Sequence, residues 1–464
     1  MKSTLQKIYG FSPVPVQNLL CTFDGFRRSR QRFTPHFHER LATWESTVLN
    51  SEEWHLENQW AELKRLITFA REKTDFYRFL PEPVWRGDAA ESIDQMLKQI
   101  QPLEKSVYRA RSRDFLPREI GPLQYRRFYT SGTTGSALEV FDTLERLAEN
   151  YAVVWRQRQS FGVDLNDPFL AFTGQVVTPI RQSAPPFWRT DHWTQRTLFS
   201  VFHMSPENAA AYVEPIHASP ATYVEGYPSA LHVVSRAMID QGRCLPPGRL
   251  KAVFTSSESL LDYQRERIEK AFGAPVRDHY ASTENVVAMT SCELNRLHVD
   301  MEFCIVEVEP VEETDEWVRG SLLVTGIGSC IAPMIRYRIG DVGIKLKRPC
   351  ECGRPGTAFL DIHGRVEDYV LTPTQRYVGR LDHIFKERFD IAEAQIVQDE
   401  ISRLEVRVVP SEEFGKDSRA RLIRDFKARV GQDMEIDIKI VDRIPREANG
   451  KFRAVRSSIA RHTL

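Results

Sequence analysis

The middle of the chain alternates helical periodicity with short β-branched or aromatic runs, and this alternation most restricts the folds open to it. Strand-like runs occur at residues 221–228, 250–256 and 274–280, and the helix-like stretch 261–272 lies between two of them. Helices that alternate with short buried strands are typical of an α/β fold with a largely parallel sheet. We therefore expect a parallel sheet covered by helices.

The flanking regions predict other structure. The first third reads as helical, and in residues 51–79 apolar side chains recur at spacings near three and four, with Ser51 as N-cap. Successive strand-like runs over residues 297–344 indicate antiparallel β structure that closes the large domain. In the tail, two β-like runs enclose the helix-like stretch 418–430, which predicts a small α+β module. We expect two domains, 1–363 and 364–464.

Charge and composition narrow the function classes. The 464 residues include 63 Lys+Arg and 63 Asp+Glu, so the formal net charge is zero and no long-range field attracts nucleic acid or an anionic membrane. No apolar run approaches the roughly 20 residues that cross a bilayer, and the first 30 residues do not resemble an export signal. Seven thinly spread cysteines fit a reducing compartment, so we expect a cytoplasmic protein.

The segment YTSGTTG at residues 129–135 combines two glycines with several hydroxyl side chains. Glycines let backbone N–H groups approach a phosphate closely, and hydroxyl groups add neutral donors. The segment lacks the Gly-Lys-Ser/Thr ending of a Walker P-loop, which disfavours a standard P-loop NTPase. Phosphate binding is the favoured interpretation, and a polar turn between a strand and a helix is the alternative.

This segment and four later ones resemble, in order, motifs of the adenylate-forming superfamily, which includes acyl-CoA synthetases. The later segments are YASTE at 280–284, RYRIGD at 336–341, GRVED at 364–368 and PREANGK at 445–451. Three others resemble the phenylacetate–CoA ligase branch, which contains ligase-like proteins associated with capsular-polysaccharide synthesis: EGYPSAL at 225–231, TSSES at 255–259 and CECGRPG at 350–356. The first 120 residues match only loosely.

The resemblance implies a fold and a reaction. It implies a large ATP- and acyl-binding domain, with mixed sheets and helices, and a small mobile C-terminal lid that swings about a hinge at Glu367. It also implies that a small carboxylic acid, with an aryl acid favoured, reacts with ATP to give an acyl-adenylate, and that the acyl group passes to coenzyme A. Alternative acceptors are an amine, a sugar or a carrier protein, and a non-catalytic nucleotide-binding scaffold is a minor alternative. A homodimer is a family-level expectation.

The resemblance also assigns roles to individual residues. Tyr280 flanks the adenine, Thr283 contacts the α-phosphate, and Glu284 holds Mg²⁺, for which a carboxylate is a suitable ligand. Asp341 accepts the ribose hydroxyls, and Arg365 reaches the ribose or a phosphate. The remaining ATP-binding residues are Thr130, Ser131, Gly132, Thr133, Thr134, Gly135, Ser257, Glu258, Ala281 and Ser282.

Lys451 is the implied catalytic lysine, which neutralises charge between the carboxylate and the α-phosphate. Structural alternatives remain open for several of these residues. Lys451 could be an ordinary solvated lysine, Glu284 could cap a helix, and a salt-bridge network could employ Arg336, Arg338, Asp341 and Arg365.

The sequence departs from the family pattern at two positions. Ala281 stands where the family has glycine, which narrows the space beside the acyl group, and Glu367 stands where the branch has Asp. Neither change removes a catalytic group. The expected substrate pocket lies near Phe141, Tyr227, Pro228 and His279, although the same residues could be plain core.

Three cysteines and a histidine form a candidate metal site. Cys292 and His298 precede a Cys-x-Cys pair in a Gly-Pro turn, Cys350 and Cys352. These four ligand types suit tetrahedral zinc. We expect a structural zinc site, and reduced thiols beside a surface histidine are the alternative.

Overall fold

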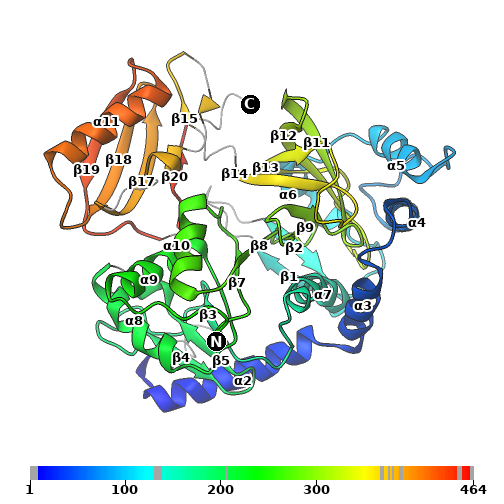
Figure 1. Ribbon diagram of the computed structural model, residues 1–464. Helices are drawn as coiled ribbons and strands as arrows, with labels where there is room; N and C mark the ends of the chain where they lie inside the picture. The colour runs from blue at the N-terminus through cyan, green and yellow to red at the C-terminus, as the bar shows by residue number, and fades with distance from the viewer. Residues whose placement is uncertain are drawn as a thin grey trace. The chain divides into compact units, whose positions relative to one another are not determined.

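Two compact units make up the chain (Figure 1). The first unit comprises Met1–Cys21, Pro168–Val276 and His363–Leu464, and the second comprises Thr22–Asp167 and Arg277–Ile362. The computed structural model describes residues 9–129, 138–204, 206–365, 370–374, 377–378, 381–385, 390–446 and 452–459. The predicted domain division at 363/364 stays a prediction.

A mostly parallel sheet forms the middle segment of the first unit. Its strands lie in the order β7-β6-β3-β5-β4, with β4 antiparallel to β5 and the other pairs parallel. The strands are β3 (Phe169–Phe172), β4 (Trp188–Asp191), β5 (Arg196–Phe199), β6 (Tyr223–Gly226) and β7 (Ala252–Ser256). The accompanying helices are α8 (Pro206–Ala218), α9 (Pro228–Asp240) and α10 (Asp262–Phe272). Parallel strands are covered on both faces, and β7 is accordingly buried at all positions but its last.

The C-terminal segment of the first unit is a four-stranded sheet with one long helix. The order is β19-β18-β17-β20, and Leu422 and Phe426 of the helix pack into its core. The elements are β17 (Ile391–Glu400), β18 (Arg403–Pro410), α11 (Lys416–Val430), β19 (Glu435–Ile440) and β20 (Val455–Ser457), preceded by β15 (Val370–Leu371), β16 (Tyr377–Val378) and η4 (Leu381–Phe385).

The sequence predicts β18 and β19 but not β17 and β20. Two buried glutamines, Gln395 and Gln398, interrupt the apolar pattern of β17. Gln398 pairs with both backbone groups of Leu371, and Gln395 donates to the carbonyl of Arg453 at 2.8 Å. Long-range hydrogen bonds therefore stabilise a strand that local hydropathy does not reveal.

Helices dominate the first third of the chain, as predicted. They are α2 (Val14–Arg32), α3 (Pro35–Thr47), α4 (Glu52–Lys73), α5 (Ala89–Lys98), α6 (Lys105–Arg111) and η1 (Ser112–Phe115). The predicted cap of α4 is confirmed, because the Ser51 hydroxyl accepts a hydrogen bond from the Trp54 N–H. Among the described residues, no helix has the length and hydropathy that a bilayer crossing requires.

An antiparallel sheet forms the rest of the second unit. Its strands are ordered β11-β12-β13-β14-β10-β9-β8. They are β8 (Val276–Ala281), β9 (Ala288–Ser291), β10 (Leu297–Val299), β11 (Cys304–Glu313), β12 (Trp317–Gly326), β13 (Tyr337–Leu346) and β14 (Ala358–Arg365). A separate hairpin of β1 (Arg126–Tyr129) and β2 (Glu139–Asp142) leads into α7 (Leu144–Ser160). The predicted α/β class, with a β region and a small α+β C-terminal module, is confirmed.

Candidate nucleotide-binding and metal sites

The expected phosphate-binding residues, Thr130–Gly135, lie outside the described residues. The strands on either side of them are paired, because Tyr129 of β1 is opposite Glu139 of β2. Phe141, expected in the substrate pocket, is 5% exposed and packs edge-on against Tyr125, with ring centroids 5.4 Å apart. The hairpin therefore holds both flanks of the candidate phosphate segment.

A turn at the end of β8 carries the central candidate residues. Ala281 ends the strand opposite Ala288 of β9, and Thr283 is exposed in the turn that follows. The Glu284 side chain is only 6% exposed, and its Oε1 lies 3.6 Å from Lys105 Nζ. The same oxygen accepts a hydrogen bond from the Tyr337 hydroxyl at 3.2 Å. Glu284 is thus a carboxylate held in place by side chains, and it does not cap a helix.

Asp341 is held in the same way from β8. The Tyr280 hydroxyl donates to Asp341 Oδ2 at 2.5 Å, and burial followed by the Asp341 charge raises the pKa of Tyr280 well above its usual value. Three strands separate β8 from β13 in the sheet order. A flat sheet would hold such strands roughly 19 Å apart, so the sheet must curl to bring these groups together.

The proposed salt-bridge network is found only in part. Arg336 pairs with Glu307 at 2.9 Å, and Arg338 pairs with Glu309 and with Glu104. These two arginines therefore have a structural role. Asp341 accepts the hydroxyl of Tyr280, and its pairing with Arg365 stays untested because the Arg365 side chain lies outside the described residues.

Other residues near β8 include a half-buried histidine that the sequence places in the substrate pocket. His279 lies opposite Thr290 of β9, and burial lowers the pKa of His279 to about 4. Its Nε2 and the Ser282 hydroxyl are buried and lack a hydrogen-bond partner within the described part of the chain. Both atoms therefore have hydrogen-bonding capacity to offer a ligand.

The first unit holds another group of expected residues. Ser257 follows β7 with φ of 73°, and Tyr227 and Pro228 begin α9. Glu258 accepts hydrogen bonds from the Ser229 N–H at 3.0 Å and from the Ser229 hydroxyl at 3.1 Å, so it caps the first turn of α9. Burial raises the pKa of Glu258.

The Lys451 and hinge predictions remain untested, since Lys451 and Glu367 lie outside the described residues. Phe452, the next residue after Lys451, donates its N–H to Glu258 at 2.6 Å. This contact places the chain immediately after Lys451 beside the first turn of α9.

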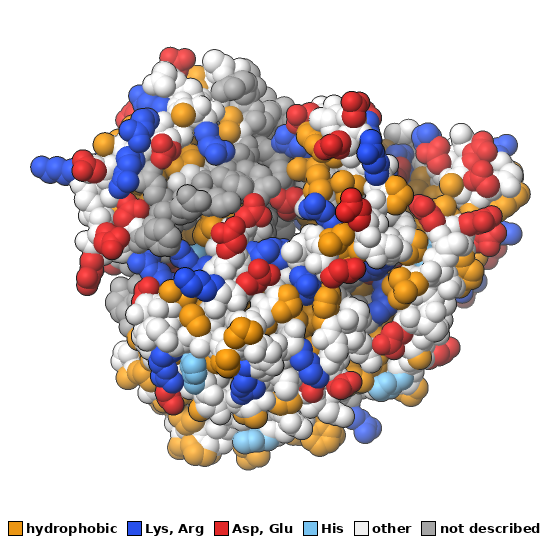
Figure 2. Space-filling view, in the orientation of Figure 1, with side chains coloured by type: hydrophobic (Ala, Val, Ile, Leu, Met, Phe, Trp, Pro, Cys, Tyr) orange, Lys and Arg blue, Asp and Glu red, His pale blue; other side chains and the backbone are white. Residues whose placement is uncertain are grey.

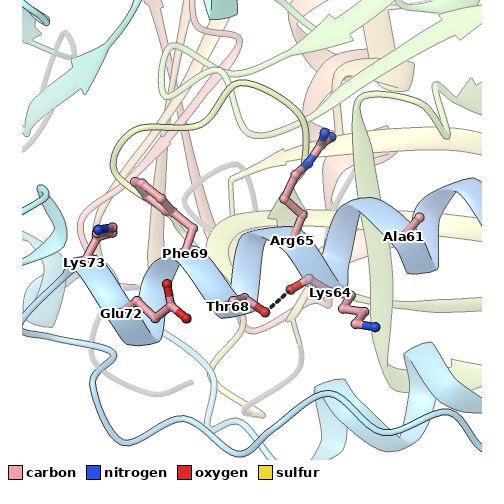
Figure 3. A pocket seen from close by; sticks show the side chains of 7 residues that line it. All are labelled: Ala61, Lys64, Arg65, Thr68, Phe69, Glu72 and Lys73. Atoms are coloured by element: carbon pink, nitrogen blue, oxygen red, sulfur yellow. Dashed lines mark hydrogen bonds between the residues drawn. The ribbon is translucent and has the colours of Figure 1, made fainter.

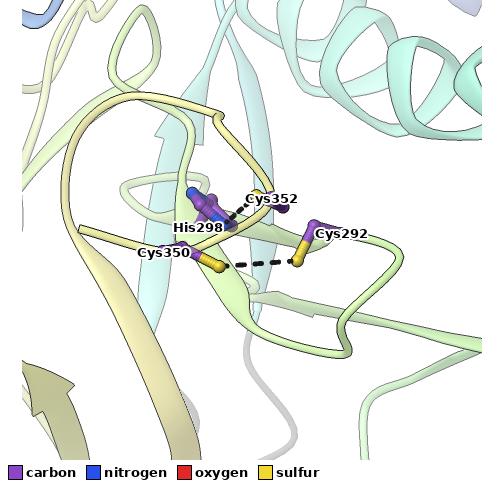
Figure 4. A group of neighbouring side chains, drawn as sticks. All are labelled: Cys292, His298, Cys350 and Cys352. Carbon is purple, nitrogen blue, oxygen red and sulfur yellow. Dashed lines mark hydrogen bonds between the residues drawn. The ribbon is translucent and has the colours of Figure 1, made fainter. Parts of the chain in front are cut away.

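The four expected metal ligands come together in the second unit (Figure 4). Their ligand atoms all lie within 4.8 Å of one another, with the Cys292 and Cys350 sulfurs 4.0 Å apart and Cys352 Sγ 3.3 Å from His298 Nε2. Zinc–ligand bonds of about 2.0–2.3 Å in a tetrahedron put ligand atoms roughly 3.5–3.8 Å apart. The donor set therefore fits zinc in both chemistry and spacing.

A separate groove runs along an exposed face of α4 (Figure 3). It is lined by Ala61, Lys64, Arg65, Thr68, Phe69, Glu72 and Lys73. None of these is among the predicted site residues, and the charged side chains along it are three basic ones and one acidic one. The visible face of the molecule likewise mixes acidic and basic side chains (Figure 2).

Solved ligase structures share this architecture. 2-Hydroxyisobutyryl-CoA ligase in the postadenylation state matches with a TM-score of 0.65 in complex with 2-HIB-AMP and 0.64 with R3-HIB-AMP, at 17% and 18% identity. Each match covers 86% of this chain and 89% of the other. The same ligase in the thioesterification state, with 2-HIB-AMP and CoA, matches with a TM-score of 0.52. The chain has the fold of these ligases, so the predicted resemblance to the adenylate-forming superfamily is confirmed at the level of the fold.

A more particular likeness lies in the sequence. Residues 370–458 match the family described as CapK C-terminal domain. Protein CapK of Staphylococcus aureus is 24% identical over 454 residues, which cover 97% of this chain and 98% of that protein. The similarity to CapK therefore extends over nearly the whole of both chains.

Some residues of the site were missed by the sequence interpretation. Lys105 and Asn285 lie outside the motifs, and Tyr337 lies inside RYRIGD but received no role. Lys105 precedes its partner Glu284 by 179 positions, so no local pattern could pair them. Asn285 directly follows the YASTE segment, and this position next to Glu284 is the one local signal by which it could have been found.

Proposed function

We propose that the protein is an AMP-forming ligase that activates a carboxylic acid with ATP and transfers the acyl group to coenzyme A. The carrying observation is that Tyr280 and Tyr337 hold two carboxylates, Asp341 and Glu284, within one unit of a chain with the adenylate-forming fold. An aryl acid is the favoured substrate class, as the sequence predicts. A cytoplasmic location and a homodimer are further proposals from the sequence.

In the first step, an oxygen of the acid attacks the α-phosphorus of ATP. The bond from that phosphorus to pyrophosphate breaks, and the acyl-adenylate forms. Charge that develops on the α-phosphate would be stabilised by a hydrogen-bond donor and a positive charge. The exposed Thr283 would supply a hydroxyl, and Lys451 would supply an ammonium group.

In the second step, the thiol sulfur of coenzyme A attacks the acyl carbon. The bond to AMP breaks, AMP leaves with the electron pair, and the thiol proton passes to solvent. Asp341 would hold the nucleotide through its ribose hydroxyls in both steps, because Tyr280 fixes the carboxylate in one orientation.

Glu284 would hold Mg²⁺. Its contacts with Tyr337 and Lys105 fall on Oε1, so Oε2 is the oxygen proposed to face the metal. A hard cation prefers such an oxygen ligand, and when bound it would neutralise charge on the phosphates. Before the nucleotide binds, the ammonium group of Lys105 offsets part of the negative charge of the Glu284 carboxylate.

ATP–pyrophosphate exchange tests the first step. A panel of aryl, fatty, amino and sugar acids should reveal acid-dependent exchange, and Lys451→Ala should lower it by about a hundredfold or more. Lys416→Ala is the matched control, because Lys416 is an exposed lysine at the start of α11. A complete lack of exchange with every acid in the panel, or equal exchange in both variants, would refute the proposal. Adding coenzyme A, amines or a carrier protein then identifies the acceptor.

We also propose that Cys292, His298, Cys350 and Cys352 hold a structural zinc ion. Protein purified without a histidine tag should contain about one zinc per chain. Cys350→Ser should lose it, and Cys244→Ser should keep it because Cys244 lies outside the cluster. Well under one zinc in the wild type, or equal zinc in both variants, would contradict the proposal.

A further inference from the structure

Asn285 closes the turn that carries Thr283 and Glu284. Its backbone has φ of 53°, in the left-handed region that asparagine tolerates better than most residues. Its N–H donates to the Ser282 carbonyl at 3.1 Å. The shape of the turn therefore depends on the conformation of Asn285.

The other polar groups of Asn285 are also bonded. Its carbonyl accepts from Arg146 Nε at 3.0 Å and from Nη2 at 2.7 Å, and Arg146 is 2% exposed. Its side-chain oxygen accepts from Asn150 Nδ2 at 3.0 Å, and its Nδ2 donates to Asp142 Oδ2 at 2.5 Å. These partly buried hydrogen bonds engage the N–H, the carbonyl and both side-chain groups of Asn285, and such networks make the groups they join more rigid, so Asn285 is fixed from several sides.

Asp142 forms the other end of this connection. It is 5% exposed, ends β2, and its Oδ1 accepts from the Thr143 N–H at 2.8 Å. β2 is the strand that follows the expected phosphate segment in the chain. One hydrogen bond between residues 143 positions apart therefore joins the residue that follows the YASTE segment to the strand that follows the expected phosphate segment.

We propose that Asn285 is a positioning residue, which acts through its bond to Asp142 to hold Thr283 and Glu284 in register with the strand after the phosphate segment. This inference rests on the proposed function. Neither Asn285 nor Asp142 contacts the nucleotide in this proposal. A displacement of about 1 Å at reacting groups can reduce a rate by about a hundredfold, so loss of the bond should act mainly on kcat.

Exchange of the two side-chain types gives a direct test. Asp142→Asn leaves one acceptor oxygen for two donors, the Thr143 N–H and Asn285 Nδ2, and Asn285→Asp leaves two carboxylates facing each other. In the double variant, the amide at position 142 can donate to the carboxylate at position 285, while Thr143 and Asn150 keep their acceptors. Each single variant should lower kcat for ATP–pyrophosphate exchange by about 10- to 100-fold, with a smaller change in KM for ATP. The double variant should recover most of the rate.

Thermal unfolding of the same proteins separates positioning from stability. Single variants that unfold at lower temperature but keep full kcat below their transition would overturn the proposal, as would a double variant that recovers neither property. Asn285→Gly provides a second test if the charged variants fold poorly, since glycine adopts the positive φ and lacks the side chain. It should fold and lose kcat by a similar factor.

Hydrogen exchange of the turn amides distinguishes failure of this inference from failure of the proposed function. If the wild-type protein shows no ATP–pyrophosphate exchange with any acid, the proposed reaction is refuted, and the catalytic role of the positioning residue is refuted with it. Deuterium uptake at residues 282–285 still decides whether the bond holds the turn. We expect faster deuterium uptake in both single variants and slow uptake in the double variant. Equal uptake in all the proteins would overturn the inference that the bond between Asn285 and Asp142 holds the turn.

Discussion

Two tyrosine hydroxyls hold the carboxylates of the candidate nucleotide site in a reciprocal arrangement. Tyr280 of β8 donates to Asp341 of β13, and Tyr337 of β13 donates to Glu284 in the turn after β8. A hydrogen bond to a charged group contributes about 1.5–3 kcal/mol. Each hydroxyl therefore restricts the orientation of one carboxylate, and the two carboxylates have different proposed ligands.

The two tyrosines should show separable effects. Tyr280→Phe removes one hydrogen bond to Asp341 and should raise KM for ATP about three- to tenfold, with little change in the Mg²⁺ dependence. Tyr337→Phe removes one hydrogen bond to Glu284 and should raise the Mg²⁺ concentration for half-maximal rate by a similar factor. Exchange kinetics at varied ATP and Mg²⁺ measure both quantities, and each variant is the control for the other. Identical changes in the two variants would contradict the assignment.

At the scale of elements, a bulge in β13 determines where Asp341 points. Arg338 is opposite Leu323 and Val342 is opposite Ser321, so the intervening stretch of β13 is longer than that of β12. Gly340 lies within this bulge with φ of 93°, which residues with a Cβ rarely adopt. The glycine therefore permits the backbone path that presents Asp341.

Gly340→Ala should lower the free energy of unfolding and also raise KM for ATP. A Cβ at Gly340 has open space around it, so backbone strain alone should lower the free energy of unfolding by about 1–2 kcal/mol. Gly87→Ala is the matched control, because Gly87 has φ of 104° and open space as well. Urea unfolding should show similar losses, while only Gly340→Ala raises KM for ATP. An unchanged KM would show that the bulge does not position Asp341.

At the scale of the whole molecule, each unit contains a histidine whose pKa is lowered by loss of contact with water. His232 accepts a hydrogen bond from Arg267 at 3.0 Å, and burial, followed by Arg267 and Arg236, lowers its pKa to about 3. In the second unit, burial lowers the pKa of His279 to about 4. Unfolded histidines titrate near pH 6.5, so between pH 6.5 and 4 the unfolded state binds more protons at these positions than the folded state does. The stability that neutral histidines contribute is present above pH 6.5 and is lost as the pH falls toward 4.

Acidification should therefore lower the unfolding temperature, partly through His232. Each such group contributes up to about 1.4 kcal/mol per pH unit over this window. His232→Gln keeps an acceptor for Arg267 and should flatten the dependence between pH 6.5 and 5, measured by thermal unfolding. His38→Gln, at an exposed position in α3, should leave the slope unchanged. A slope in His232→Gln equal to that of the wild type would argue against this role.

Local patterns predicted much of the fold. The Ser51 cap, the parallel strands β6 and β7 and the helix α10 depend on periodicity and capping within a few residues, and these predictions are confirmed. Strand β17 was not predicted, because the partners of Gln395 and Gln398 lie elsewhere in the chain. The metal cluster could be proposed because its residue types and spacing are distinctive, and the structure brings the four side chains together.

The sequence by itself was enough to propose which residues carry the chemistry, since the motif segments contain Tyr280, Glu284 and Asp341 in order along the chain. Only the tertiary structure decided how they are held. Tyr280 and Asp341 are 61 positions apart, and Asn285 and Asp142 are 143 apart. Composition and periodicity report the preferences of neighbouring residues, whereas these contacts depend on sheet order, the β13 bulge and the curl of the sheet. Those features arise from packing across the whole unit, and no single window of sequence contains them.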